Sequence, residues 1–476
     1  MTTTVNAVIV DSAITLLRVI LQALEIPLSI FQATTEYVSP SATSSLRPNA
    51  KTIVIVGGNF AGLAALKYLK SHNDGSYKIV LMDQRSYSEY TPGILRLFCA
   101  PDEFSDLAQP LPSSQTNFHC IQGKVTSLID DQGKKVLRYT TTGMSTKTLQ
   151  YDHAIVATGS TYNDSTPISP SSQEMTYQGR LQGWKTAHEK LAAAKNVIIL
   201  GGGAVGVELA AEIADYMPDT KVTLLDASSR LVSNFSTKVS EYALKWLAKH
   251  GVDVRLGQSL KSWTDRSCTL QDGSVLQADL VYVCFGSKPN SDMMKSKQAL
   301  LCSLTKRRNI QVKETLEIVP ANDDDNQLDS LGIFACGDVS MPPSSGEDQA
   351  FQAETQGKVA ATNVLKMVQS DFTRQKSNLY RYPQDVAFGK NQMPMVYILS
   401  LGKHDGVLGF NSLIIPGPLA AIAKFVLEFT KVLDMRGSLL GKLIWKLADA
   451  VVLFLSSTVL PPASKEATPT KEIKAA

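Results

Sequence analysis

The sequence predicts an α/β fold built around two parallel sheets, each flanked by helices. A run of apolar strand-forming residues, 52–56, leads into a glycine-rich turn and the start of a helix. The same order of features recurs at 197–208, about 145 residues later. In both places a second strand follows and ends on an aspartate, Asp83 and Asp226. Strand, glycine turn, helix and acid-ended strand together predict two Rossmann-like βαβ units.

Length, charge and cysteine spacing narrow the class of protein. A chain of 476 residues has room for about three domains. Its net charge of +3 and the absence of a basic tract give no case for nucleic-acid binding. The six cysteines contain no C-x-x-C spacing, and the histidines form no metal-binding pattern, which argues against zinc and iron–sulfur sites.

The first glycine turn has the pattern of a phosphate-binding loop. Gly57 permits a tight turn after the strand, Gly58 follows it, and Gly62 lets the helix pack close to the strand. Asn59 stands where the usual pattern has glycine, and we expect it to be tolerated. Asp83 is spaced to hold ribose hydroxyls, so this unit is predicted to bind a dinucleotide.

The second turn carries the full G-x-G-x-x-G pattern in Gly201, Gly203 and Gly206. Asp226 ends the next strand, where a carboxylate accepts from the adenosine ribose and repels a 2′-phosphate. We therefore expect NADH as the nicotinamide cofactor, while nearby Arg230 leaves NADPH open.

Two such units in one chain suggest one tightly bound flavin and one exchangeable nicotinamide cofactor. Further strand ends fit this arrangement in their order and spacing. These are Ala157, Thr158 and Gly159 in the first unit, Gly286 in the second, and a late strand followed by Gly337 and Asp338. Asp338 is placed to meet the ribityl hydroxyls of a flavin.

These pieces, in this order, resemble the two-dinucleotide-binding-domain flavoproteins over roughly residues 50–365. Within that family the chain looks most like the apoptosis-inducing-factor-like (AMID) proteins and the type II NADH dehydrogenases. The resemblance implies an NADH domain inserted in an FAD domain, a C-terminal α+β domain, and electron delivery to a quinone. The implied bounds are 1–50 for a helix and linker, 51–160 and 288–368 for the FAD domain, 161–287 for the NADH domain, 369–460 for the C-terminal domain and 461–476 for a disordered tail.

The resemblance also implies residue roles. Gly57, Asn59, Gly62 and Asp83 would hold the FAD adenosine and pyrophosphate, the backbone of Val125 would meet the adenine edge, and Asp338 would take the ribityl chain. Gly201, Gly203, Gly206 and Asp226 would hold NADH. Glu208 would lie near the nicotinamide, and Gly286 would let its ring approach the flavin. Gln352 and Gln356 would lie on a helix beside the quinone.

Both ends of the chain are apolar and predict attachment to a membrane surface. Residues 5–30 form an apolar helix with a narrow polar stripe of Asp11, Arg18 and Glu25, which interrupts any membrane span. Residues 418–456 form an apolar helical stretch with scattered lysines, as in a helix lying among lipid headgroups. We expect a peripheral protein inside the cell, at a mitochondrial membrane or a lipid-droplet or cytoplasmic face. The alternative is that these helices cover each other or a homodimer interface.

Other functions remain open on the sequence. A disulfide reductase would need a cysteine pair shortly after the first βαβ unit, and only Cys99 is there. A sulfide:quinone reductase would need paired cysteines at the flavin, which Cys120 or Cys284 with Cys336 could supply. A redox-sensing signalling flavoprotein, or a flavin reductase that delivers electrons to another protein, would keep both βαβ units. Turnover of NADH with quinones separates an enzyme from a sensor.

Overall fold

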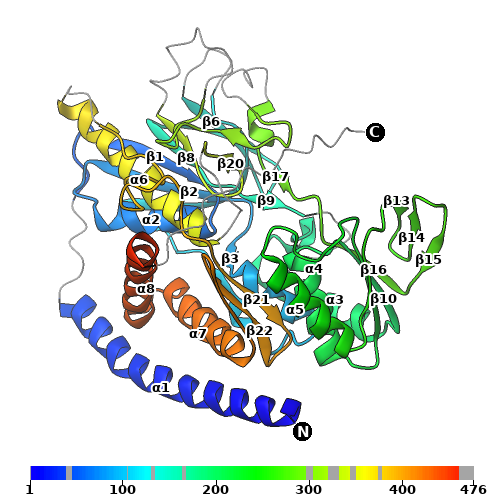
Figure 1. Ribbon diagram of the computed structural model, residues 1–476. Helices are drawn as coiled ribbons and strands as arrows, with labels where there is room; N and C mark the ends of the chain where they lie inside the picture. Colours follow the sequence, from blue (N-terminus) through cyan, green and yellow to red (C-terminus); the bar gives the residue numbers. More distant parts are fainter. Residues whose placement is uncertain are drawn as a thin grey trace.

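The computed structural model describes residues 2–38, 45–103, 105–129, 135–162, 168–295, 304–319, 332–343, 350–373 and 378–459. Within these residues, two parallel sheets occupy different parts of the molecule, and an antiparallel sheet with two helices follows in the chain (Figure 1). The predicted α/β fold with two Rossmann-like units is confirmed. The predicted tail at 461–476 and a predicted acidic loop at Asp323–Asp325 lie outside the described residues.

The larger sheet contains the strands around the first glycine turn. They are β1 (Lys51–Val56), β2 (Tyr77–Asp83), β5 (Phe118–Ser127), β6 (Val136–Thr141), β7 (Thr146–Gln150), β8 (His153–Val156) and β19 (Ile333–Ala335). The order is β19-β8-β1-β2-β5-β6-β7, with β19 to β5 parallel and β6 and β7 antiparallel. The chain therefore returns to this sheet, through β19, after it has built the second unit.

Two helices of this first unit pack at backbone distance. They are α2 (Phe60–Ser71), which follows the glycine turn, and α6 (Ala350–Thr373). A Cβ atom added to Gly357 would lie 2.2 Å from the carbonyl oxygen of Ala61, so only glycine fits there. Helix α6 begins at Ala350 and ends at Thr373.

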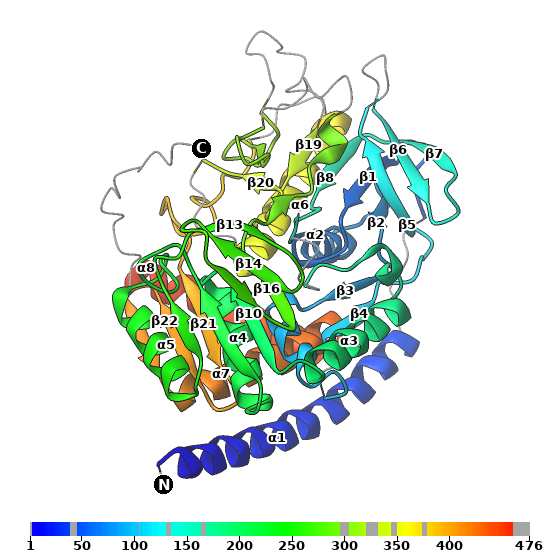
Figure 2. The ribbon, with the colours of Figure 1, turned by 90° about the vertical axis from the view of Figure 1, so that its right-hand side faces the viewer.

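The second sheet has the order β12-β11-β10-β16, and all four strands are parallel. Its strands are β10 (Asn196–Leu200), β11 (Lys221–Leu225), β12 (Asp253–Arg255) and β16 (Leu280–Val283). The helices of this unit are α3 (Tyr177–Ala192), α4 (Ala204–Tyr216) and α5 (Thr237–Lys249). An antiparallel sheet of β13 (Leu260–Trp263), β14 (Ser267–Leu270) and β15 (Val275–Gln277) packs beside β16 (Figure 2).

Two short strands join the units where the chain crosses between them. β9 (Ser160–Thr161) pairs antiparallel with β17 (Lys288–Pro289). The strands are thus distributed as expected for a unit inserted between residues 161 and 287, although the exact domain bounds stay a prediction. The other short pairs are β3 (Tyr87–Glu89) with β4 (Ala108–Pro110), and β18 (Ile310–Gln311) with β20 (Ser340–Met341).

The C-terminal part combines an antiparallel sheet with two helices. Its strands are β21 (Val396–Leu401), β22 (Asp405–Phe410) and β23 (Leu413–Pro416), and its helices are α7 (Pro418–Met435) and α8 (Leu439–Thr458). The predicted helical stretch 418–456 is therefore two helices. The break comes at Gly437, which has a φ of +82°, and at Ser438, whose side chain caps α8 by accepting from Gly441 N–H.

Helix α7 turns a stripe of charged side chains toward the interior. Lys424, Glu428, Lys431 and Asp434 are 5–8% exposed. The sequence analysis counts Lys424 and Lys431 among the lysines of a headgroup-facing helix, and for these two residues that is wrong. Both lysines are buried because carboxylates on other segments pair with them. Glu212 lies 3.7 Å from Lys424 Nζ, and Glu354 contacts Lys431 Nζ.

One buried arginine connects three parts of the chain. Arg96 lies in the 3-10 helix Thr91–Phe98, in the first unit. Its Nε is 3.3 Å from Glu212 Oε1 on α4, and its Nη1 is 3.4 Å from Glu428 Oε1 on α7. These three side chains are 0–7% exposed. The ion pairs therefore fix the first unit, the second unit and the C-terminal helices against one another.

The N-terminal helix α1 (Thr2–Val38) lies along α7 and α8 (Figure 1). Residues of the polar stripe contact the protein: exposed Asp11 bonds to His404, and Glu25 accepts from Ser438 Oγ. By length and composition the segment Ala7–Gln32 could cross a membrane, with a mean hydropathy of 1.9 in its most apolar window. Among the described helices, no other segment meets those criteria.

We expect Arg96→Met to lower the free energy of unfolding by about 3–5 kcal/mol, because buried Glu428 would lose the Arg96 guanidinium and buried Glu212 would keep only the Lys424 ammonium, 3.7 Å away. The matched control is Arg255→Met, since Arg255 is 44% exposed and pairs at the surface with Asp253. That control should change stability by less than about 1 kcal/mol. Thermal and urea unfolding measure both variants. An equal free energy of unfolding in the two variants would show that the buried ion pairs stabilise the fold no more than the surface pair does.

Candidate active site

The first glycine turn has the backbone geometry of a phosphate-binding loop. Gly57 has a φ of +110°, and a Cβ atom there would lie 2.2 Å from the carbonyl oxygen of Ala157. A Cβ atom on Gly62 would lie 1.8 Å from the carbonyl oxygen of Gly57. The turn is therefore closed against β8 and against its own helix, and the first N–H groups of α2 point out of it. This cradle fits a pyrophosphate.

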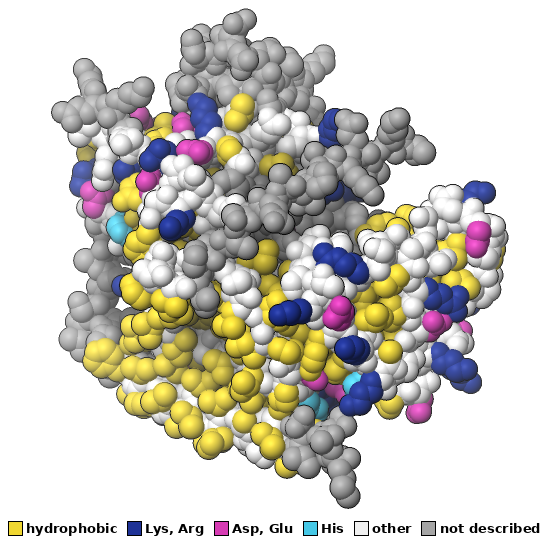
Figure 3. Space-filling view, viewed as in Figure 1, with side chains coloured by type: hydrophobic (Ala, Val, Ile, Leu, Met, Phe, Trp, Pro, Cys, Tyr) yellow, Lys and Arg dark blue, Asp and Glu magenta, His cyan; other side chains and the backbone are white. Residues whose placement is uncertain are grey.

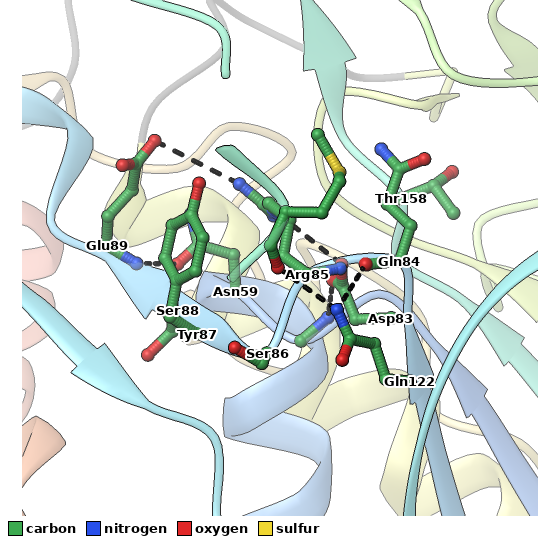
Figure 4. Close-up of polar contacts among 12 residues, drawn as sticks. Asn59, Asp83, Gln84, Arg85, Ser86, Tyr87, Ser88, Glu89, Gln122 and Thr158 are labelled. Atoms are coloured by element: carbon green, nitrogen blue, oxygen red, sulfur yellow. Dashed lines mark hydrogen bonds and ion pairs between the residues drawn. The ribbon is translucent and has the colours of Figure 1, made fainter. Parts of the chain in front are cut away.

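Asn59 fits this turn for a simpler reason than the sequence suggests. It is the N-cap of α2 with φ −116° and ψ −152°, an ordinary extended conformation, so its backbone does not call for glycine. Its side-chain oxygen accepts from the backbone N–H of Glu89 at 3.3 Å, on β3 (Figure 4). The asparagine thus joins the glycine turn to the neighbouring strand.

Asp83 lies at the end of β2 and is 7% exposed. One carboxylate oxygen accepts from Gly58 N–H at 2.6 Å, and the other accepts from Arg85 N–H at 2.8 Å. Arg85 also reaches toward Glu89, with 4.0 Å between Nη1 and Oε1 (Figure 4). The acid therefore shapes the loop as well as offering oxygens to a ribose.

A buried ion pair behind this loop was missed by the sequence analysis. Arg180 on α3 is fully buried and bonds to Glu89 at 2.9 Å and to Glu174 at 2.6 Å. It therefore anchors β3, and with β3 the Asn59 contact. Neither Arg180 nor Arg85 has a sequence signal of its own, apart from the place of Arg85 two residues after Asp83.

The second glycine turn repeats the first almost contact for contact. Gly201 has a φ of +109°, and a Cβ atom on Gly206 would lie 1.9 Å from the carbonyl oxygen of Gly201. Asp226 accepts from Gly202 N–H and from Ser228 N–H. At Gly203 an added Cβ atom would meet open space, unlike at the corresponding turn position Asn59, where a side chain is present. This turn has the geometry for a second dinucleotide.

Arg230 is engaged with its own loop. Its guanidinium donates to the carbonyl oxygens of Phe235, at 2.8 Å, and of Ser233. The cation that the sequence offered as a partner for a 2′-phosphate is therefore committed to backbone acceptors. Asp226, with its carboxylate at the end of β11, remains the residue placed to contact the ribose.

The crossing between the units is organised by Asn290, which the sequence analysis did not single out. Thr158 Oγ1 donates to the Asn290 carbonyl at 2.8 Å, and Asn290 Nδ2 donates to the Thr158 carbonyl at 2.9 Å. Asn290 N–H also donates to the Gly159 carbonyl at 2.9 Å. Gly159 and Gly286 have φ values of +64° and +77°, and an added Cβ atom on either would meet open space. Both strand ends therefore leave room for a flat ring to approach.

Asp338 follows β19 on the same side of the sheet as the first glycine turn. Its carboxylate accepts from Ser160 Oγ at 3.2 Å, and burial raises the pKa of this carboxyl. Hydroxyl donors such as those of a ribityl chain would offset that desolvation. Gly337 beside it has a φ of +72°, which favours glycine. The residues present fit a flavin at this position.

The two glutamines of α6 are both buried but differ in their contacts. Gln356 Oε1 accepts from Gly337 N–H at 2.7 Å and therefore holds the loop that carries Asp338. Gln352 lies one turn earlier on the same helix and is 8% exposed. Gln356 thus holds the loop beside the position predicted for the flavin, and the quinone role predicted for Gln352 and Gln356 stays a prediction.

Glu208 lies on α4, five residues after Gly203, and accepts from Ser400 N–H at 2.7 Å on β21. Burial raises the pKa of the Glu208 carboxyl, while the Lys424 ammonium and the Ser400 N–H act in the opposite direction. This acid connects the second unit to the C-terminal sheet, and whether it also contacts a nicotinamide stays a prediction.

Val125 lies on β5, three residues beyond Gln122, which pairs with Asp83. It is 7% exposed, and the register of β5 with β6 shifts directly after it. A bulge of this kind re-aims the backbone. Val125 is thus at the same edge of the sheet as the ribose acid, as its predicted adenine contact requires.

The cysteines nearest the strand ends are poor candidates for thiol chemistry. Cys284 and Cys336 are free and buried, and burial raises the pKa of each thiol to about 12. Thiols of this kind carry almost no thiolate near neutral pH. Cys284 and Cys336 therefore favour neither disulfide nor sulfide chemistry.

The chain matches the family model described as pyridine nucleotide-disulphide oxidoreductase over residues 51–357. It is 29% identical over 334 residues to the oxidoreductase ptaL of Pestalotiopsis fici, covering 66% of this chain and 83% of that one. It is 27% identical over 373 residues to ferroptosis suppressor protein 1 of Xenopus laevis, covering 75% and 88% of the two chains.

Two solved structures share its fold. One is NDH2 from Plasmodium falciparum in complex with NADH, with a TM-score of 0.60 and 14% identity over 87% of this chain and 99% of that one. The other is the sulfide:quinone oxidoreductase of Aquifex aeolicus, with a TM-score of 0.65 and 17% identity over 87% and 100%. At these identities the likeness shows the fold alone.

We expect Gln356→Leu to weaken FAD binding by about tenfold, because Gly337 N–H loses its acceptor beside Asp338. Gln352→Leu should keep FAD and its bleaching by NADH, and should slow recovery of the flavin absorbance when a quinone is added. The control is Gln369→Leu, an exposed glutamine on the same helix. The flavin-to-protein ratio and stopped-flow absorbance measure all three. Full flavin content in Gln356→Leu would contradict the expectation that Gln356 supports FAD binding through the loop of Asp338.

Proposed function

Because the chain belongs to the pyridine nucleotide-disulphide oxidoreductase family, and is thereby an FAD-dependent NAD(P)H oxidoreductase, we propose that it takes a hydride from NADH and delivers electrons to a quinone at a membrane surface. The observation that carries this proposal is the pair of matching glycine turns, at Gly57 and Gly201, in two parallel sheets joined through Asn290. Two dinucleotides bound there would meet between the units.

The division of roles follows from the surroundings of each turn. The first turn is closed by Asn59 and the buried Asp83, which suits a cofactor that stays bound. The second turn is open at Gly203, which suits a cofactor that exchanges. FAD, when bound, would supply a ring that accepts a hydride. The protein supplies orientation, through Asp338 at the flavin side and Gly286 at the nicotinamide side.

Preference for NADH is supported by Asp226 and Arg230 together. The carboxylate at the end of β11 disfavours a 2′-phosphate, and the nearest expected counter-cation donates to the carbonyl oxygens of Ser233 and Phe235. An NADP-specific site would need a free cation at this point.

Quinone as the acceptor is supported by three observations. The thiols of Cys284 and Cys336 are buried and protonated, so a sulfur substrate has no partner there. Gln352 lies one helical turn before Gln356 on α6, and Gln356 bonds to the loop that carries Asp338. The outer faces of α1 and α8 expose large apolar side chains, and a long-tailed quinone stays in the bilayer. A soluble electron acceptor would need none of that surface.

The purified protein should be yellow, and NADH should bleach its flavin bands without oxygen. Addition of a short-tailed quinone should restore the bands, with catalytic turnover of NADH. Absorbance spectra before and after each addition make the measurement. Protein that is colourless and takes up no FAD would overturn the proposed chemistry. Bleaching that no quinone reverses would instead support a redox-sensing role.

We expect Asp226→Ala to narrow the preference for NADH over NADPH by about tenfold, because the repulsion of a 2′-phosphate and a ribose contact are both lost. Asp272→Ala is the matched control, since Asp272 lies at the surface of the same unit, in the turn between β14 and β15. The ratio of kcat/KM for the two cofactors is the readout. A wild-type preference for NADPH would contradict this assignment.

A further inference from the structure

Helix α1 is held to the protein by its polar side. Asp11 Oδ1 lies 2.9 Å from His404 Nε2, and Glu25 accepts from Ser438 Oγ at 2.7 Å. Farther along, Gln32 Oε1 accepts from Leu439 N–H at 3.1 Å, and the Arg18 guanidinium lies over the Phe425 ring. These contacts extend from Asp11 to Gln32, so this part of the helix is held along the body.

The opposite side of α1 is apolar and exposed. Of the apolar side chains described in this helix, Val10 and Leu21 are buried. Others are 44–61% exposed, and they are Val8, Ile9, Leu16, Val19, Ile20, Leu24, Ile26, Ile30 and Phe31. A helix in contact with water normally has the reverse orientation.

Helices α7 and α8 show the same inversion. On α7 the charged stripe of Lys424, Glu428, Lys431 and Asp434 points inward. On α8, Asp449 pairs with Lys358 of α6, while the outward stripe is apolar. That stripe is 45–67% exposed and repeats at helical spacing in Leu443, Leu447, Val451 and Phe454.

Figure 3 shows hydrophobic side chains gathered over the region of α1, α7 and α8. Leu419, at the start of α7, is 64% exposed and belongs to the same face. Exposed lysines, Lys442 and Lys446, lie on α8 next to its apolar stripe. Long basic side chains at such a place can reach headgroups while their stems stay in apolar surroundings. We call the exposed apolar side chains of α1 and α8, together with Leu419, the outer face.

We propose that the outer face docks on a phospholipid bilayer with α1 lying flat, its polar stripe against the body and its apolar side in the acyl boundary. This deepens the proposed function, since it names the surface through which a membrane quinone would be reached. A flat orientation follows from the contacts of Asp11 and Gln32, which tie both ends of the segment to the protein. A spanning orientation would break them and place Asp11 and Glu25 in lipid.

Docking of this kind is driven mainly by apolar burial, with Lys442 and Lys446 as a smaller charged contribution beside the apolar stripe of α8. The described part of α1 contains one basic residue, Arg18, and it contacts Phe425. Binding should therefore occur on vesicles of neutral phosphatidylcholine and should persist at about 1 M salt, where the Debye length is about 3 Å.

The test is sedimentation of the full-length FAD-loaded protein with phosphatidylcholine vesicles. The double variant Leu16→Glu/Leu447→Glu should bind at least ~10-fold more weakly than the wild type, because two leucines can no longer enter the acyl boundary. The matched control is Val275→Glu, since Val275 is 54% exposed on β15, in the antiparallel sheet away from α1. It should bind like the wild type. Flavin content and NADH bleaching should be the same in all three proteins.

Each alternative to bilayer docking predicts a different experimental result. Equal vesicle binding by the double variant and the control would overturn the proposal, and so would binding abolished by salt. A wild type that is dimeric by light scattering without lipid, and monomeric in the double variant, would assign the outer face to a second copy. Vesicle binding without quinone turnover would leave the docking surface intact and remove the proposed acceptor, so the two failures are distinguishable.

The depth of α1 in the bilayer, measured along the helix, tests its proposed flat orientation. Tryptophan placed at Ile9, Leu16 or Ile30 should gain emission that brominated lipids quench to the same extent at all three positions. A steady change in depth along the helix would show that α1 spans the bilayer and would overturn the flat orientation.

Discussion

The arrangement of the whole molecule depends on the buried ion pairs of Arg96. The arginine lies in the first unit, Glu212 in the second and Glu428 in the C-terminal helices. Three segments distant in the chain thereby share one cluster from which water is excluded. Removal of the Arg96 guanidinium would leave Glu428 without this partner and Glu212 with only Lys424 in a low-dielectric interior, so the cluster disfavours other relative positions of the units. The geometry between the two glycine turns is set by this constraint together with Asn290.

Features whose cause is local could be predicted from the sequence. The glycine turns, the acids at the ends of β2 and β11, and the strands around them depend on residues within one βαβ unit. Asn59 was expected to be tolerated in the first turn, and the structure gives a different reason for this, since its backbone is extended and its side chain accepts from the Glu89 N–H. The family resemblance supplied the order of the units, which no single motif contains.

Features that depend on partners distant in the sequence could not be predicted. Asn290 bonds to Thr158, and Gln356 bonds to Gly337. No sequence pattern marks either pair of residues. The charges on α7 appeared as lysines scattered on an apolar helix. Their carboxylate partners, Glu212 and Glu354, lie on helices of two other parts of the chain. Periodicity shows that a helix has two faces, and the tertiary contacts decide which face points inward. The polar stripe of α1 is the clearest case.

The two glycine turns show how one local geometry can serve two kinetic roles. Asp83 and Asp226 each accept from the second glycine of their turn and from the N–H two residues beyond themselves. The backbone cradle is thus the same, and affinity for a pyrophosphate should differ little on that account. The two turns differ in the residues that pack over them. Asn59 and β3 close the first turn, whereas the second is open at Gly203. The buried pair of Arg180 and Glu89 holds β3 beside the first turn. This difference in packing around similar loops supports the proposal of a resident flavin at the first turn and an exchanging nicotinamide at the second.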